Sequence, residues 1–142
     1  MASRNVERIR VAIREGLVEK AVRSLALRAY QALLAASPVD TGFFRAGWTA
    51  SVGAPDRAGP ELPATPSDRD TTVAQASGLL ATRQGQAAAV AGGYKVGQGP
   101  AFIVNNVRYG VYLNEGSSAQ APARFVELAI LEAVAATKRD LR

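Results

Sequence analysis

The chain has 142 residues, a formal net charge of +5, and neither cysteine nor histidine. This length fits one domain, so we expect a single unit spanning residues 1–142. Without cysteine or histidine, disulfides, thiolate metal sites and the commonest general base are excluded, and we expect no cofactor, no metal and no enzymatic activity. No apolar run is long enough to cross a bilayer, and the amino terminus lacks the apolar core of a secretory signal, so we expect no membrane partner.

The basic residues are concentrated in the first quarter of the chain. Residues 1–36 hold Arg4, Arg8, Arg10, Arg14, Lys20, Arg23 and Arg28 against Glu7, Glu15 and Glu19. A basic excess on one element favours an acidic partner, either nucleic acid or an acidic protein surface.

The pattern of apolar residues predicts one long helix over residues 4–36. Apolar side chains recur at steps of three and four from Val6 through Ile9, Ile13 and Leu17 to Leu33. Further valines at 11, 18 and 22 widen this stripe, so we expect the helix to contact its own sheet and a second body, such as a neighbouring subunit. The helix should end at Ser37, because the residue before a proline is disfavoured in the α region.

A tight turn and a strand are predicted next. Asp40 and Thr41 can bond to nearby backbone N–H groups and Gly42 can adopt a left-handed conformation, which favours a turn before a strand over residues 44–52. Trp48 on this strand should be buried. Asp40 is also a possible metal ligand or acid, although a turn residue beside Thr and Gly is the more ordinary interpretation.

Residues 54–70 carry four of the seven prolines and few apolar side chains, which predicts an extended arm or loop. A helix should follow over residues 71–91, with Ser67 or Asp70 as its cap. The glycines at 92, 93, 97 and 99 match neither nucleotide-binding spacing, and a strand rather than a helix follows them, so we interpret them as a turn.

Two more strands and a helix complete the prediction. Residues 101–105 form a strand with Phe102 buried. Residues 107–113 alternate like a half-buried strand that ends at a positive-φ Gly116. Pro122 should open a last helix over residues 122–141 that buries Phe125, Leu128, Ala129, Leu131 and Ala135. The sequence therefore predicts an α+β fold: long N-terminal and C-terminal helices packed on a small, mainly antiparallel β-sheet, with a long Pro-rich arm.

Two motifs in this order resemble the neck or tail-completion (head–tail joining) family of long-tailed bacteriophages. The first is Pro-Val-Asp-Thr-Gly at 38–42 followed by Trp48, and the second is Asn-Asn-Val-Arg-Tyr at 105–109 followed by Glu115-Gly116 and Ala121-Pro122. The resemblance covers about residues 37–128. One departure is Phe43-Phe44, where family members more often have a basic residue or leucine.

This resemblance implies a structural virion protein at the head–tail neck, made in the cytoplasm of the bacterial host. It would form a homo-oligomeric ring of six-fold or twelve-fold symmetry around double-stranded DNA, between the head–tail connector and the tail terminator or tail tube proteins. A gene transfer agent would use the same part. Subunit and partner contacts are expected at Tyr112, Asn114, Glu115, Gln120, Arg45, Pro60, Leu62 and Pro63, and possible DNA-facing residues are Arg4, Arg8 and Arg14.

Two alternatives stay open. A small nucleic-acid-binding module would use the Arg-rich first helix, and a steep dependence of its affinity on salt would favour it. A hydrolase would use Glu115 with Asp40 as a carboxylate pair, although neither carboxylate has a visible reason for a perturbed pKa.

Overall fold

The predicted α+β class is confirmed, because the chain is mostly helical with a small antiparallel sheet and a helix toward each end. The structure, a computed structural model, describes residues 2–38, 42–57, 69–107 and 110–141. In chain order its elements are α1 (Ala2–Ala36), α2 (Phe43–Ala46), β1 (Trp48–Val52), α3 (Arg69–Gly93), β2 (Ala101–Asn105), α4 (Gly110–Tyr112), an irregular turn η1 (Leu113–Ser117) and α5 (Phe125–Asp140).

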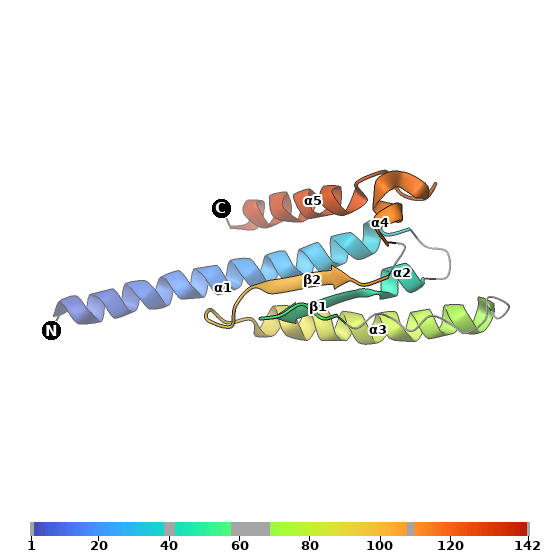
Figure 1. The fold of residues 1–142 in the computed structure, drawn as a ribbon. Helices are drawn as coiled ribbons and strands as arrows, with labels where there is room; N and C mark the ends of the chain where they lie inside the picture. Colours follow the sequence, from blue (N-terminus) through green and yellow to red (C-terminus); the bar gives the residue numbers. More distant parts are fainter. Residues whose placement is uncertain (1, 39–41, 58–68, 108–109, 142) are drawn as a thin grey trace.

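The helices and strands run roughly parallel to one another and stack in layers (Figure 1). The strands β1 and β2 pair antiparallel, from Trp48 opposite Asn105 to Val52 opposite Ala101. The helix α3 packs against β1, and α1 lies across the sheet from it and contacts both α3 and α5. The sheet therefore lies between α3 and α1 and stays partly exposed, and α5 forms an outer layer on α1.

The long helix α1 confirms the prediction for residues 4–36, but only its second half belongs to the packed body. Every described side chain from Arg4 to Val18 is exposed, and burial increases from residue 19 onward. The Glu19 carboxylate accepts a hydrogen bond from the Val96 backbone N–H at 2.9 Å, and Arg23 Nε donates to the Tyr94 carbonyl at 2.8 Å. The first half of α1 extends beyond these contacts as a free helix, as Figure 1 shows.

The core is centred on aromatic rings from four parts of the chain. Phe44 meets Trp48 edge-on with ring centroids 5.9 Å apart, and it meets Phe125 in the same way at 6.0 Å. Such edge-to-face pairs are favourable beyond the area that they bury. Tyr30 closes the cluster from α1, since its hydroxyl donates to the Trp48 carbonyl oxygen at 3.3 Å. This cluster ties α1, α2, β1 and α5 together.

The predicted strand over residues 44–52 is wrong in its first part. Residues Phe43–Ala46 form one helical turn, and the Ala46 N–H donates to the Gly42 carbonyl. A Cβ on Gly47 would lie 2.6 Å from Asn105 Oδ1 and 2.8 Å from Val107 Cγ2, so the backbone passes close to the end of β2 there. Gly47 ends the helical turn, and the strand begins at the next residue, Trp48.

The predicted strand over residues 107–113 is also wrong where the chain is described, at Val107 and at residues 110–113. The described sheet ends where Trp48 pairs with Asn105, and no described strand lies beside the residues that follow. Where the chain is described again, the Gly110 N–H donates to the Val107 carbonyl and a helical turn begins. A period-two pattern without a partner strand therefore does not produce a strand.

The last helix begins at Phe125 rather than at Pro122, because Arg124 holds a left-handed conformation (φ 61°) at the helix boundary. Its buried face is Phe125, Ala129, Ala133 and Thr137, whereas Leu128, Leu131 and Ala135 are exposed, contrary to prediction. Small side chains every fourth residue let α5 lie close to α1, and Val126 and Ile130 beside this stripe are partly buried against the core. Phe102 is half-buried rather than buried.

Most of the turn predictions are confirmed where the structure describes them. Gly42 and Gly116 have positive φ angles of 90° and 101°, and Gly97 and Gly99 lie with positive φ in the turn that leads into β2. Gly92 and Gly93, which were predicted to belong to this turn, are instead the last two residues of α3. The helix α3 begins at Arg69, so Asp70 lies inside it rather than at its cap. Most of the predicted arm, residues 58–68, lies outside the described residues, as does Ser67.

Candidate functional site

The segment from Gly110 to Phe125, which we call the corner, connects the end of the sheet to α5. A Cβ on Gly110 would lie 2.9 Å from Phe44 Cε2, so the start of the corner lies directly on the core aromatic cluster. Its end is anchored by Phe125, which is 1% exposed. Gly116 turns the chain with a φ that favours glycine, and the nearest atom to its absent Cβ is Ala123 Cβ at 3.1 Å. The corner is therefore fixed at both ends and folded against itself.

Asn114 holds the corner to the first turn of α5. Arg124, the residue at the helix boundary, provides no side-chain cap. Instead Asn114 Oδ1 accepts a hydrogen bond from the Val126 backbone N–H at 3.0 Å, and the Asn114 carbonyl accepts one from the Arg124 N–H. An oxygen on an N–H of the first turn is the interaction that an N-cap side chain normally supplies. The cap of α5 thus comes from a residue ten positions before the boundary.

The same asparagine also binds the carboxylate of Glu127. Asn114 Nδ2 donates to both Glu127 carboxylate oxygens, at 3.2 and 3.0 Å. This hydrogen bond is the main reason that the pKa of Glu127 lies below its usual value, and a backbone N–H and the charge of Arg124 act in the same direction. A carboxylate near a helix N-terminus is also favoured by the helix dipole.

We expect Asn114→Ala to destabilise the protein by about 1 kcal/mol, the usual effect of losing an N-cap, and to raise the pKa of Glu127. Because the pKa of Glu127 is lowered in the folded state, its contribution is present above the unfolded-state pKa and is lost as pH falls through the folded-state pKa. Carboxyl-carbon NMR titration of both proteins measures the shift. An unchanged Glu127 titration in the variant would contradict the assigned contact.

Three of the predicted contact residues lie on the outside of the corner. Tyr112 is 65% exposed, and Glu115 and Gln120 are exposed on the turn that follows. Asn114 lies among them, but its side chain is engaged in holding α5. The corner therefore presents an aromatic ring and polar groups on a fixed backbone, an arrangement suited to protein–protein contact.

Of the other predicted contact residues only Arg45 is described, and it does not join this surface. Arg45 is half-buried in α2, with Nη2 3.5 Å from the Ser37 carbonyl oxygen. Pro60, Leu62 and Pro63 lie outside the described residues. The structure thus brings together only the part of the predicted set that lies in the corner.

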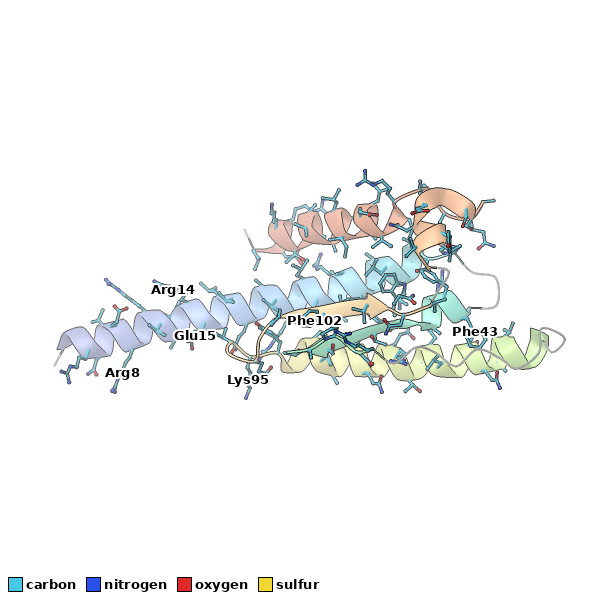
Figure 2. All side chains as sticks on the ribbon, in the orientation of Figure 1. Arg8, Arg14, Glu15, Phe43, Lys95 and Phe102 are labelled. Atoms are coloured by element: carbon cyan, nitrogen blue, oxygen red, sulfur yellow. The ribbon has the colours of Figure 1, made fainter. Side chains whose placement is uncertain are left out.

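The predicted DNA-facing residues are all on the free half of α1. Arg4, Arg8 and Arg14 are exposed, and Figure 2 shows Arg8 and Arg14 on different sides of the helix, both directed away from the body. They form no single basic face. DNA contact by these residues stays a prediction.

Neither a metal centre nor a membrane span is found in the part of the chain that the structure describes. No group of three or more acidic side chains could hold a metal ion there, and no helix there is both long and apolar enough to cross a membrane. Glu115 is exposed, and its predicted partner Asp40 lies outside the described residues. The carboxylate-pair hypothesis therefore has no further support.

Sequence reasoning missed the polar side chains that build this region. Asn105 Nδ2 donates to the Phe44 carbonyl at 2.7 Å, and Asn105 Oδ1 accepts from the Val107 N–H at 3.1 Å, which fixes the exit from β2. Ser37 Oγ accepts from Trp48 Nε1 at 2.8 Å. Asn105 was visible in the sequence as the end of a strand and part of a motif, but its partner Phe44 lies 61 positions away in the chain.

Comparisons of the chain with protein-family models, with curated proteins and with solved structures find no match. A functional assignment therefore depends on the residues, their geometry and the resemblance of the two sequence motifs.

Proposed function

We propose that this protein is a structural component of the head–tail neck of a tailed phage or phage-like particle, and that it helps to join the tail to the head connector. The observation that carries the proposal is the corner. Its motif residues resemble those of the neck and tail-completion family, and the exposed Tyr112 and Glu115 lie on a backbone that the core fixes at both ends.

The different roles of neighbouring residues within the motif support this proposal. In Asn114-Glu115-Gly116, the asparagine caps α5 and the glycine makes the turn, while the glutamate has no role in the described hydrogen bonds and is exposed. Two residues thus build the corner and present the third. A partner surface that recognises Tyr112 and Glu115 would meet a preorganised site, which lowers the entropy cost of binding.

The shape of the subunit supports assembly into a ring. A structural subunit of a ring needs contact surfaces on two sides, and this chain has the corner at one end of α1 and a free helix at the other (Figure 1). In the proposed assembly the ring surrounds the channel for double-stranded DNA and contacts the connector on one side and the tail terminator or tail tube on the other.

Locating the protein in particles tests the proposal. We expect an antibody or gold label against a tagged version of this chain to bind at the junction between head and tail in electron micrographs of purified particles. Label confined to the capsid shell or the tail tip, or particles that lack the protein altogether, would contradict the proposed function.

A further inference from the structure

The free half of α1 carries an apolar stripe that has no partner within the described chain. Its members Val6, Ile9, Ile13 and Leu17 are between 47% and 61% exposed. With 3.6 residues per turn, these four residues lie on one side of the helix, and Val11 and Val18 lie on the opposite side. Large aliphatic side chains in a row along a solvated helix are typical of an interaction surface.

A second unpartnered apolar surface lies on the described body of the same molecule. It is a groove of about 320 Å³ between α1, β2 and α5. Its lining includes Val22, Leu25, Ala29, Ile103, Ile130 and Val134. A cavity of about 150 Å³ holds one benzene-sized group, so this groove has room for two or three aliphatic side chains.

The stripe cannot fill the groove of its own chain. Val22, Leu25 and Ala29, which line the groove, lie on the same continuous helix as the stripe, a few turns further along. A straight helix keeps these two positions apart, so a stripe that fills this groove must belong to another copy of the chain. The volume of the groove is enough for two side chains one turn apart, such as Ile13 and Leu17.

From these two surfaces we propose that the free half of α1 docks, by its Val6–Leu17 stripe, in the groove of a second copy of this chain. The inference rests on the proposed function, since it names the contact between neighbouring copies of the ring. A contact of two different surfaces is heterologous: each copy that inserts its stripe leaves its own groove open for the next copy, and the series can close into a ring.

The contact is small, so its stability depends on repetition between copies. The stripe runs from residue 6 to residue 17, which is about 17 Å of helix. If half of a helix about 10 Å wide is covered over that length, the contact buries about 270 Å². A stable interface buries about 800 Å² per partner. One contact is therefore weak by itself. In a closed assembly every copy takes part in two such contacts, and further contacts, for example at the corner, add to them.

Crosslinking tests the docking directly, because the natural chain has no cysteine. Two single-cysteine variants, Ile13→Cys in isotope-labelled protein and Val134→Cys in unlabelled protein, are mixed at high concentration and treated with a short thiol crosslinker. We expect mixed products that join position 13 of one copy to position 134 of another. Products that join only position 13 to position 13, or a chain that stays monomeric by sedimentation at about 1 mM, where even a weak contact is populated, would overturn the proposal.

Two variants, one triple and one double, distinguish an effect on docking from an effect on folding. Ile9→Ser/Ile13→Ser/Leu17→Ser removes the stripe, and Val11→Ser/Val18→Ser changes the opposite side of the same free helix. Since all five side chains are exposed, both variants should retain the melting temperature. We expect the stripe variant to associate at least tenfold more weakly and the control to associate like the natural protein, and equal weakening in both would overturn the proposal.

These outcomes are independent of the test of the proposed function. Crosslinks between positions 13 and 134 in a protein that is absent from the head–tail junction would support the docking and reject the neck function. Label at the junction without such crosslinks would support the neck function and reject the docking.

Discussion

Replacing Trp48 by alanine is expected to destabilise the protein by about 3–5 kcal/mol, the usual range for truncating a large aromatic residue in a core. Trp48 is 5% exposed and contacts Phe44 edge-on. Its indole N–H donates to Ser37 Oγ at 2.8 Å, and Ser37 Oγ in turn donates to the Leu33 carbonyl at 2.6 Å. The substitution therefore leaves a cavity and breaks a buried chain of hydrogen bonds between α1 and β1.

Thermal and urea unfolding measure this effect, and for a protein of this size the melting temperature should fall by about 10 °C or more. Trp48→Phe is the control. It keeps part of the ring packing but loses the indole hydrogen bond and some buried ring volume, so we expect a cost smaller than that of Trp48→Ala. If Trp48→Ala melts like the natural protein, the core assigned to α1, α2, β1 and α5 is wrong.

The sequence was sufficient to predict the elements whose signals are local. The apolar repeat of α1, the Ser37-Pro38 boundary and the positive-φ glycines at 42 and 116 each depend on neighbouring residues, and all are confirmed. The strand over 101–105 was also predicted with its observed bounds. Long-range packing did not have to be known for any of these.

The errors arose where a distant partner decides the local structure. Residues 107–113 have the alternation of a strand, but no strand in the described part of the chain lies beside them, since β1 starts at Trp48. The start of α5 depends on Asn114, which caps Val126 from outside the helix. The exposure of Leu128 depends on how closely α1 approaches the alanines at 129 and 133. Periodicity within the chain cannot report these contacts.

The candidate site was predicted in part. Tyr112 and Glu115 were expected as contact residues and lie on the exposed side of the corner. The structural role of Asn114 was missed, because an asparagine at a turn has the same local signal whether its side chain binds a partner or a helix of its own chain.

The second large effect is expected from changing the corner. Tyr112→Ala combined with Glu115→Lys removes the exposed ring and reverses the exposed charge. Neither side chain takes part in a described hydrogen bond or belongs to the described core, so the subunit should fold with an unchanged melting temperature. In the proposed neck, however, the variant should lose an anchor and gain a repulsive charge at the docking surface, and truncating an anchor residue commonly costs about 2 kcal/mol or more. Repeated around a ring, this loss should abolish joining.

The control makes the same kinds of change away from the corner. Leu141→Ala combined with Glu132→Lys removes an exposed apolar side chain and reverses an exposed carboxylate in and after α5. We expect this variant to fold and to give joined particles in normal numbers, which would exclude a general effect of charge or solubility.

Counting joined and separate particles by electron microscopy tests the proposed joining function most directly. The genome that encodes this chain is altered to carry either double variant, and lysates are compared with the natural one. With Tyr112→Ala/Glu115→Lys we predict filled heads and complete tails that accumulate apart. Joined, infectious particles in normal numbers from that variant would show that the corner is not the surface that joins head and tail.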